Sequence, residues 1–227
     1  AMDPQQWLLM EETLHCVEDS GLPLSELQKK RTAVFIGATS IDYLLEAVHP
    51  EVRIENYVGS GAYAFSLANR ISHYFGLNGK SFALDAACAS SLVAMHEAKR
   101  ALLNGECDYA LVGGVNLNFY PWKFVVWSKN RMFSPDGQCK TFDKDANGFV
   151  SGDGVGVVLL QRKQDALATR SKIYGLIRGS AVNHGGKALS MTVPRVEAQK
   201  DVLLAAYQDA GISPETVNYV ETHGTRH

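Results

Sequence analysis

Residues 81–98 have the sequence Ser81-Phe82-Ala83-Leu84-Asp85-Ala86-Ala87-Cys88-Ala89-Ser90-Ser91-Leu92-Val93-Ala94-Met95-His96-Glu97-Ala98, and this stretch decides the fold. Its first part, residues 81–87, is short and mostly apolar, which is typical of a buried strand. Residues 89–103 are mainly of the types that favour a helix. The sequence therefore predicts a strand that leads directly into a helix, with Cys88 in the turn between them.

Cys88 is a candidate nucleophile because of this position. A side chain at the start of a helix lies beside free backbone N–H groups and the positive end of the helix dipole. Both favour the thiolate, which is the nucleophilic form of cysteine. We expect Ser90 and Ser91 to accept hydrogen bonds from N–H groups of the first turn. From this stretch alone a second interpretation stays open, in which Cys88 is an ordinary buried cysteine.

The composition indicates a cytoplasmic globular protein. The chain has 227 residues, of which 46% are hydrophobic and 20% charged, and its formal net charge is −2. This balance predicts neither a nucleic-acid partner nor a membrane partner. The four cysteines, Cys16, Cys88, Cys107 and Cys139, are widely spaced and form no CxxC pair, which indicates reduced thiols.

Both ends of the sequence favour a portion of a longer protein. The first residue is not Met, and the last residues follow directly on an expected strand at residues 217–221. We therefore expect residues 1–227 to be part of a larger polypeptide.

Apolar runs and helical patterns alternate along the chain. Strands are expected at residues 32–37, 81–87, 109–115, 155–160, 173–181 and 217–221. Helices are expected at residues 5–20, 41–48 (a short helix or a loop), 62–75, 89–103, 121–130, 163–169 and 196–210. Between them, residues 134–154 form a long polar loop of the kind that usually carries function. Several strands are apolar on both faces, which predicts an α/β fold with a mainly parallel, covered sheet.

Three short motifs suggest phosphate, calcium or dinucleotide sites, but each lacks an essential part. Residues 76–81 end like a phosphate-binding loop but precede a strand, and the required first glycine would fall at Tyr74. Residues 143–148 open like a calcium loop, yet Gly154 stands where the bidentate Glu belongs. The glycines of residues 152–156 lead into a strand instead of out of one. We therefore assign none of the three motifs to a phosphate, calcium or dinucleotide site.

A cysteine nucleophile needs a base or an electrostatic partner. His223 follows the strand expected at residues 217–221, and strand ends are where open α/β sheets place ligands. His184 lies in a glycine turn and is a weaker candidate. His96 is more than two turns into the helix after Cys88 and fits ordinary packing.

Several motifs resemble those of β-ketoacyl synthases. Asp85-Ala86-Ala87-Cys88-Ala89-Ser90-Ser91 resembles the family's active-site motif, and Glu221-Thr222-His223-Gly224-Thr225 resembles its first histidine motif. Further similarity lies in the same order at residues 2–6, 134–137, 146–149 and 152–156. The chain looks most like the N-terminal portion of a ketosynthase domain of a modular type I polyketide synthase. Residues 183–187 resemble the form found where acyltransferases act in trans.

The resemblance implies a thiolase-like fold, with two related α/β halves in an αβαβα sandwich and a homodimer. Residues 1–227 would be the first half and the start of the second. It implies that Cys88 accepts an acyl group from the phosphopantetheine of an acyl carrier protein. Decarboxylation of a carrier-bound malonyl thioester then gives the carbanion that attacks this acyl group. His223 would stabilise the enolate, and the backbone N–H of Cys88 would help bind the acyl oxyanion. No metal or redox cofactor is implied.

The sequence also departs from the family pattern. Trp7 stands where the family usually has Arg, and Arg226 and His227 replace the usual Gly-Thr. The family's catalytic Lys and second catalytic His have no counterpart in the 227 residues. We therefore expect this portion to be incomplete for condensation.

Three other interpretations stay open. One is a cysteine hydrolase, because its Cys and His can also lie far apart in sequence, although its local signature is absent here. The second is a relative that binds and passes on acyl chains without extending them. The third is a condensing enzyme of fatty-acid synthesis.

Overall fold

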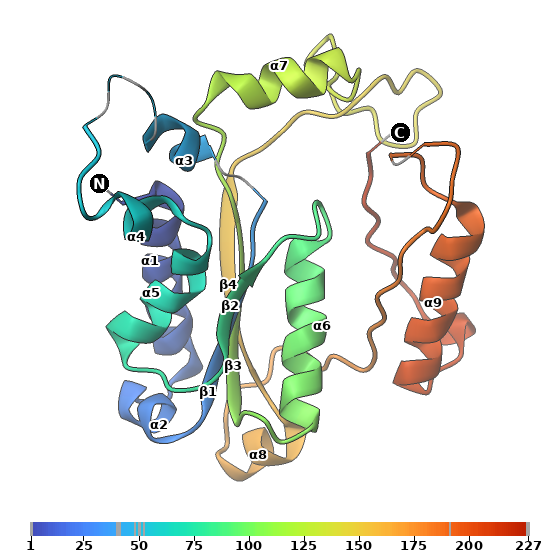
Figure 1. The fold of residues 1–227 in the computed structure, drawn as a ribbon. Helices are drawn as coiled ribbons and strands as arrows, with labels where there is room; N and C mark the ends of the chain where they lie inside the picture. The colour runs from blue at the N-terminus through green and yellow to red at the C-terminus, as the bar shows by residue number, and fades with distance from the viewer. Residues whose placement is uncertain are drawn as a thin grey trace. The chain divides into compact units, whose positions relative to one another are not determined.

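A four-stranded mixed sheet forms the centre of the first of two units into which the chain divides (Figure 1). The computed structural model describes residues 2–39, 42–47, 49, 51, 53–190 and 192–225. Unit 1 comprises Ala1–Pro121 and Gly152–Gly175, and unit 2 comprises Trp122–Ser151 and Leu176–His227. Each unit is described separately below.

The sheet of unit 1 has the order β2-β1-β3-β4. Its strands are β1 (Thr32–Gly37), β2 (Ser81–Leu84), β3 (Tyr109–Asn116) and β4 (Gly154–Gln161). Strands β2, β1 and β3 are parallel, and β4 runs antiparallel to β3. This confirms the predicted mixed, mainly parallel sheet. The carboxyl ends of the three parallel strands share one edge, and the turn that holds Cys88 starts from it.

The helices are α1 (Pro4–Ser20), α2 (Leu24–Lys29), α3 (Asp42–Ala47), α4 (Val58–Ala62), α5 (Phe65–Phe75), α6 (Ser90–Leu103), α7 (Pro121–Lys129), α8 (Lys163–Ala168) and α9 (Val196–Ala210), with a short 3₁₀ helix at Pro214–Thr216. Most helices agree with the sequence pattern, whereas α2 and most of α4 were not predicted. The first and last residues of the helix expected at 41–48 lie outside the described residues. Within the described ranges, no helix has the length and apolar character needed to cross a bilayer.

One predicted helix is interrupted. Residues 62–75 were expected to be a single helix, but α4 ends at Ala62, Tyr63 is extended, and α5 begins at Phe65. The carbonyl oxygen of Gly61 accepts hydrogen bonds from the Asp3 N–H at 2.8 Å and from Gln6 Nε2 at 2.9 Å. This carbonyl is bound to the start of α1, which explains why the helix does not continue through it.

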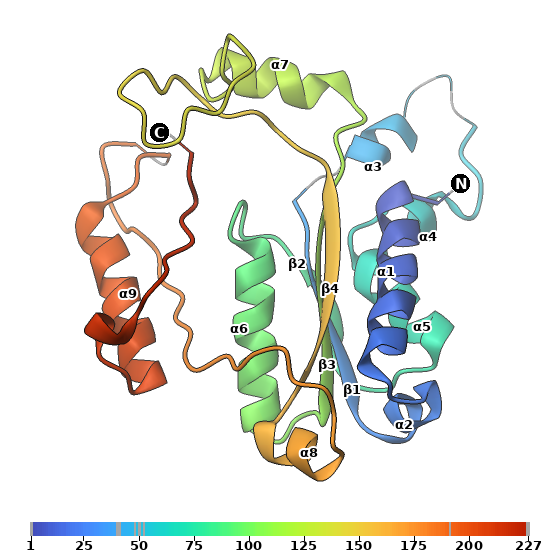
Figure 2. The same cartoon turned by 180° about the vertical axis from the view of Figure 1, so that it is seen from behind.

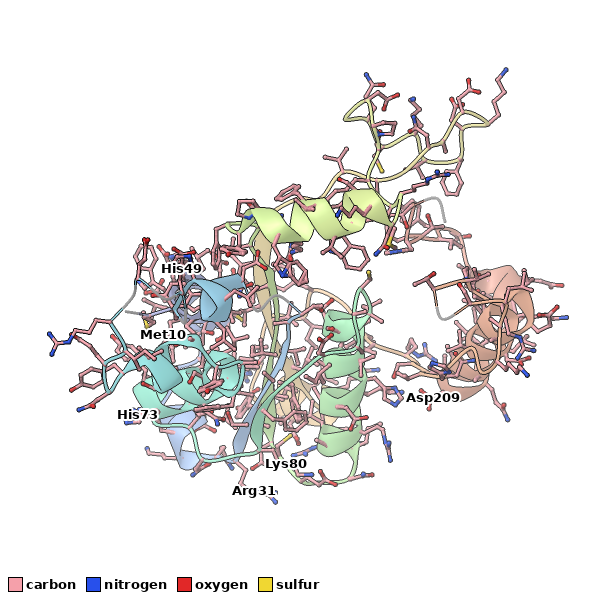
Figure 3. The ribbon with its side chains drawn as sticks, turned by 45° about the horizontal axis from the view of Figure 1, so that its top comes forward. Met10, Arg31, His49, His73, Lys80 and Asp209 are labelled. Atoms are coloured by element: carbon pink, nitrogen blue, oxygen red, sulfur yellow. The ribbon has the colours of Figure 1, made fainter. Side chains whose placement is uncertain are left out.

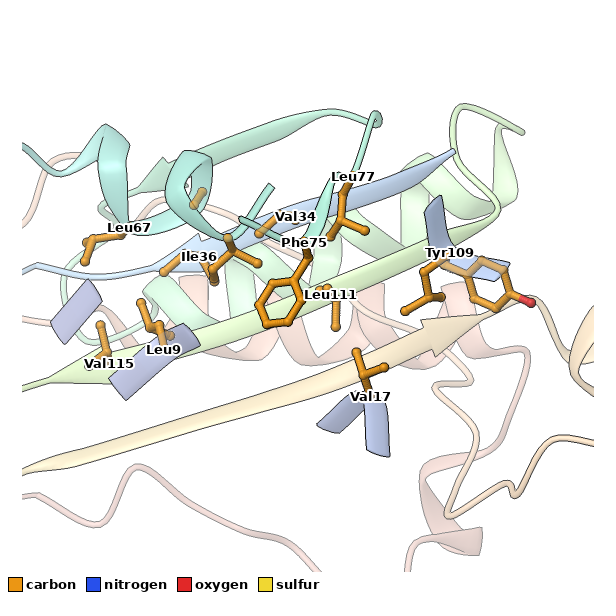
Figure 4. Packing of buried hydrophobic residues seen from close by; sticks show 13 residues of the cluster. Leu9, Val17, Val34, Ile36, Leu67, Phe75, Leu77, Tyr109, Leu111 and Val115 are labelled. Atoms are coloured by element: carbon orange, nitrogen blue, oxygen red, sulfur yellow. The ribbon is translucent and has the colours of Figure 1, made fainter. Parts of the chain in front are cut away.

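Helices cover both faces of the sheet, with α1 and α5 on one face and α6 on the other (Figures 1 and 2). All six residues of β1 are buried. Val34 and Ile36 pack with Leu9 and Phe75 on the first face (Figure 4), while Phe35 packs with residues of α6 on the second. Alternation along one fully buried strand therefore builds two cores.

Alanines make up most of the buried side of α6 in the second core. Ala94, Ala98 and Ala101 form the buried side of α6 and pack against Ala33 and other residues of β1 and β3. Alanine adds little bulk between backbones, so α6 can lie close to the sheet. This close packing positions the start of α6, which follows the turn that holds Cys88.

Charged side chains lie at the opposite end of the sheet, where the parallel strands begin. Arg31 and Lys80, both labelled in Figure 3, pair with Asp108 and Glu106. The hydrogen bond from Lys80 lowers the pKa of Glu106 below its ordinary value. Exposed pairs of this kind contribute little to stability, so the hydrophobic cores hold the unit together.

Three sequence expectations about strands are wrong. Strand β2 lies at the edge of the sheet and is only partly buried, with Phe82 38% exposed. Residues 173–181 and 217–221 form no strand in the structure. Within unit 2, the backbone N–H of Ser180 donates instead to Asp209 of α9, which Figure 3 labels, at 2.8 Å. An alternating pattern forms a strand only where a neighbouring strand completes its ladder, and none does so among the described residues.

The first core gives a direct test of the fold. Leu9 is fully buried, whereas Leu14 on the same helix is 44% exposed. We expect Leu9→Ala to lower the free energy of unfolding by about 2–5 kcal/mol, because it removes buried methyl groups and leaves a cavity. Leu14→Ala is the matched control and should cost well under about 1 kcal/mol. Urea unfolding followed by circular dichroism measures both. Equal effects of the two substitutions would contradict the assigned face of α1.

Candidate active site

Cys88 lies in the turn that joins β2 to α6, as the sequence predicts. Its side chain is exposed, which excludes the interpretation as an ordinary buried cysteine. Cys107, by contrast, is fully buried. The sulfur is therefore accessible at the carboxyl edge of the parallel strands.

The turn before Cys88 has an unusual backbone conformation. Ala87 has a φ angle of 51°, in the left-handed region that residues with a Cβ rarely adopt. Such a conformation costs about 1–3 kcal/mol and persists only where surrounding contacts fix it. Strained backbone is common at functional sites, and here it immediately precedes the candidate nucleophile.

A set of polar contacts fixes this turn. The Ala87 N–H donates to Asp85 Oδ1 at 2.8 Å, and the Ala87 carbonyl accepts from Ser90 Oγ at 2.6 Å. Ser90 Oγ in turn accepts from the Ala86 N–H at 2.8 Å. Thr39 Oγ1 lies 3.1 Å from Asp85 Oδ1 and joins the end of β1 to the same network. The backbone on both sides of Ala87 is thus held by side chains from three segments.

Ser90 differs from its predicted role. We expected it to accept hydrogen bonds from the first turn of α6, but its hydroxyl reaches back to the backbone of Ala86 and Ala87. The N-cap position is Ala89, which has no side-chain acceptor. Ser90 is 5% exposed, so its hydroxyl stabilises the turn from a buried position.

Two glycines, one at the end of β1 and one near the end of β3, let α6 approach the sheet. A Cβ at Gly37, the last residue of β1, would lie 2.4 Å from the Ser90 carbonyl carbon and 2.5 Å from the Ser91 nitrogen. A Cβ at Gly114 of β3 would lie 2.9 Å from the Ser91 Cβ. The first turn of α6 therefore rests directly on the backbone of β1 and β3.

Sequence reasoning missed these supporting residues. Gly37, Gly114, Thr39 and Asp85 place Cys88 without being nucleophiles themselves. A signal was present in the sequence, because two apolar strands each reach a glycine near their carboxyl end. Glycine at such a place often marks a close backbone approach.

His223 belongs to unit 2, whereas Cys88 belongs to unit 1. It is exposed and lies in a segment without regular secondary structure. Gly224, which follows it, has a φ angle of 68°, and its carbonyl accepts a hydrogen bond from Thr141 Oγ1 at 2.6 Å. The pairing of Cys88 with His223 stays a prediction.

The other histidine candidates have local roles. The Nδ1 atom of His184 accepts from the Gly186 N–H at 2.9 Å, so the imidazole closes its own glycine turn. His96 lies half-buried within α6. The described hydrogen bond of His184 thus stays within its own turn.

A hollow with a volume of about 500 Å³ lies in the described part of unit 2. Arg131, Asn147 and Val193 are among the residues that line it, and neither predicted catalytic residue does so. Within the described ranges, no group of three or more His, Cys, Asp or Glu side chains is arranged to hold a metal ion. The expectation that no metal or cofactor is bound stays a prediction.

Comparison with known proteins points to one family. The family model of the β-ketoacyl synthase N-terminal domain matches residues 1–166, and that of the C-terminal domain matches residues 174–226. Polyketide synthase ThaG of Burkholderia thailandensis is 45% identical over 226 residues, which are 99% of this chain and 4% of that protein. Polyketide synthase PksN of Bacillus subtilis is 41% identical over 224 residues, 99% of this chain and 4% of that protein.

Solved structures give the same answer for the fold. The oxazolomycin ketosynthase domain OzmH KS7 of Streptomyces albus matches with a TM-score of 0.92 and 36% identity, over 99% of this chain and 38% of that chain. The ketosynthase from module 6 of the bacillaene synthase of Bacillus subtilis matches with a TM-score of 0.90 and 40% identity, over the same shares. The predicted thiolase-like fold is confirmed for the part that this chain spans.

The support beneath α6 can be tested at Gly37. We expect Gly37→Ala to lower the free energy of unfolding by about 1–3 kcal/mol, because the new Cβ overlaps the α6 backbone. Amide hydrogen exchange at residues 88–92 should accelerate in the same variant. The control is Gly156→Ala in β4, where no heavy atom lies within 4 Å of the added Cβ. A Gly37→Ala protein as stable as the control would show that α6 does not rest on β1.

The cysteines should differ in their response to pH. Burial, aided by the charge of Asp19, raises the pKa of Cys16 to about 11, and burial also raises the pKa of Cys107. A thiol with a raised pKa stays protonated, and hence unreactive, until the pH approaches that value. At pH 8 we expect iodoacetamide to modify the exposed Cys88 and Cys139 well before Cys16 or Cys107, as peptide mass spectrometry would show. Labelling of Cys16 should increase as the pH rises toward 11, and equal labelling of Cys16 and Cys139 at pH 8 would contradict this assignment.

Proposed function

Because this chain belongs to the β-ketoacyl synthase family, we propose that it carries the acyl-accepting part of a polyketide synthase ketosynthase domain. The named relatives are polyketide synthases, and the matched structures are ketosynthase domains of such synthases. The chain spans 4% of the length of those two relatives and 38% of the two solved chains. These shares support the proposal that the 227 residues comprise the N-terminal half of a ketosynthase domain and the start of its C-terminal half.

One observation carries the proposal, namely an exposed thiol on a turn that its surroundings fix. Cys88 is exposed, while the backbone beside it is held by Asp85, Ser90 and Thr39. A nucleophile that is already held in the reactive orientation does not have to lose conformational freedom during the reaction. This combination supports covalent catalysis at the sulfur.

In the first proposed step, Cys88 accepts the growing acyl chain. Its thiolate attacks the carbonyl carbon of an acyl thioester on the phosphopantetheine arm of an acyl carrier protein. A new carbon–sulfur bond forms to Cys88, the bond to the pantetheine sulfur breaks, and the pantetheine thiolate takes up the proton that Cys88 released. The backbone N–H of Cys88 stabilises the oxyanion while the carbonyl is tetrahedral.

In the second proposed step, a carrier-bound malonyl thioester loses CO₂. The electrons of the broken carbon–carbon bond form an enolate, and His223 stabilises it by donating a hydrogen bond to the thioester oxygen. The enolate carbon attacks the acyl group on Cys88, and the Cys88 thiolate leaves. The product is a chain lengthened by two carbons on the carrier protein.

The proposal also distinguishes what the 227 residues do alone from what the complete domain does. The 227 residues acylate at Cys88 but do not complete condensation alone, since they hold no counterpart of the family's Lys and second His. The reaction needs no metal or redox cofactor, and the complete domain is a homodimer. A cytoplasmic location rests on the cysteines, all four of which are free thiols.

Cys88 can be tested directly against a second exposed cysteine. We expect incubation with an acyl thioester to add one acyl group at Cys88, located by peptide mass spectrometry. Cys88→Ala should abolish the adduct, because the sulfur is the acceptor. Cys139→Ala, which removes the other exposed cysteine, should leave it unchanged.

The same incubation separates the alternatives. Acylation followed by rapid release of free acid, without any need for a carrier, would favour a cysteine hydrolase and contradict the proposal. Addition of malonyl carrier protein should give no extended product from the 227 residues alone. Efficient carbon–carbon bond formation by the 227 residues alone would refute the proposal that they are incomplete for condensation. If the longer protein that contains this chain transfers acyl groups without extending them, it is a non-elongating relative.

A further inference from the structure

The carbonyl group that follows His223 is held by a side chain from a distant loop. Thr141 Oγ1 donates a hydrogen bond of 2.6 Å to the Gly224 carbonyl oxygen, across 83 positions of the sequence. The Thr141 methyl group lies 3.3 Å from the place where a Cβ of residue 224 would stand. Gly224 has a φ angle of 68° and follows His223 directly. The Thr141 hydroxyl thus holds the backbone beside the predicted catalytic imidazole.

Hydrogen bonds and an ion pair stabilise the loop that contains Thr141. Asp136 accepts hydrogen bonds from Ser134 Oγ at 2.5 Å and from Asn147 Nδ2 at 3.2 Å, and it pairs with Lys140. The hydrogen bond from Lys140 is the main reason that the pKa of Asp136 lies far below its usual range. Lys140 immediately precedes Thr141, so the carboxylate anchors the segment that carries the hydroxyl.

An aromatic contact closes the base of this loop. Phe133 and Phe149 pack edge to face with ring centroids 5.1 Å apart, and the backbone N–H of Ser134 donates to the Phe149 carbonyl at 2.9 Å. Residues 134–148 therefore form a loop with a joined base and an internal carboxylate anchor. All of these residues, together with His223 and Gly224, belong to unit 2.

We propose that Thr141 is a positioning residue for His223, and that its hydroxyl sets the direction of the imidazole by fixing the Gly224 carbonyl. This inference rests on the proposed function, in which His223 stabilises the malonyl enolate. Thr141 contacts neither substrate nor reacting atoms in this role. Its loss should weaken the step that needs His223 and leave the acylation of Cys88 unchanged.

Four variants of the protein that carries this chain test the inference. Thr141→Val removes the hydroxyl and keeps the shape, Thr141→Ser keeps the hydroxyl, and His223→Ala removes the imidazole. Thr216→Val is the matched control, because Thr216 Oγ1 also donates to a backbone carbonyl, that of Ser213, at 2.7 Å on an exposed part of unit 2. The two rates to measure are CO₂ release from malonyl carrier protein and single-turnover acylation of Cys88.

We expect Thr141→Val to lower kcat for CO₂ release by about three- to tenfold with little change in KM, which is the scale of one lost hydrogen bond. Thr141→Ser should recover most of this rate, and Thr216→Val should match the wild type. Cys88 acylation and the melting temperature should stay unchanged in Thr141→Val.

The outcomes separate this inference from its premise. If His223→Ala leaves CO₂ release unchanged, the proposed role of His223 fails and the inference fails with it. If His223→Ala is impaired while Thr141→Val resembles Thr216→Val, only the positioning role is overturned. An equal loss of acylation and CO₂ release in Thr141→Val, or no recovery in Thr141→Ser, would mean a general structural role and would also overturn it.

Discussion

The close approach of a helix to two strand ends is the constraint on which the Cys88 site depends. The first turn of α6 lies so near to Gly37 and Gly114 that a Cβ at Gly37 would overlap its backbone. A helix held at this distance cannot tilt or slide without losing contact with β1 and β3. The turn before it must then span a fixed gap from the end of β2 to the start of α6. In the turn that spans this gap, Ala87 has the left-handed backbone conformation.

The energy that maintains this arrangement comes from the two cores of unit 1. On one face, large aliphatic and aromatic side chains such as Leu9, Ile36 and Phe75 are fully or nearly fully buried. On the other, the alanines of α6 meet the sheet with little side-chain volume between them. Burial of the large side chains stabilises the sheet. The small side chains of α6 allow the helix to pack at a short distance from the strands. The strain at Ala87, about 1–3 kcal/mol, is small beside the burial of even a few such side chains.

The sequence predicted those elements whose signals are local. Strand β1 was predicted with its observed bounds, and α9 ends at Gly211 because glycine readily adopts the left-handed cap found there. Cys88 was found because helix-favouring residues begin directly after it. The roles of Gly37, Thr39 and Asp85 were missed, because each depends on a neighbour brought close only by folding. The strand prediction for residues 173–181 was wrong for a similar reason. An alternating pattern shows which side chains are apolar, but it does not show whether a neighbouring strand is present.

The two predicted catalytic residues have supports of different kinds. Cys88 lies just before a helix whose first turn rests on strand backbones, so its position follows from the packing of unit 1. His223 lies outside regular structure, and the backbone beside it accepts a hydrogen bond from Thr141, on a loop anchored by Asp136. Packing against backbone changes little with small alterations of side chains, whereas the hydrogen bond from Thr141 is lost when its hydroxyl is removed. Substitutions among relatives that keep Cys88 in place can therefore still alter the orientation of His223, and in the proposed function they would tune decarboxylation separately from acyl transfer.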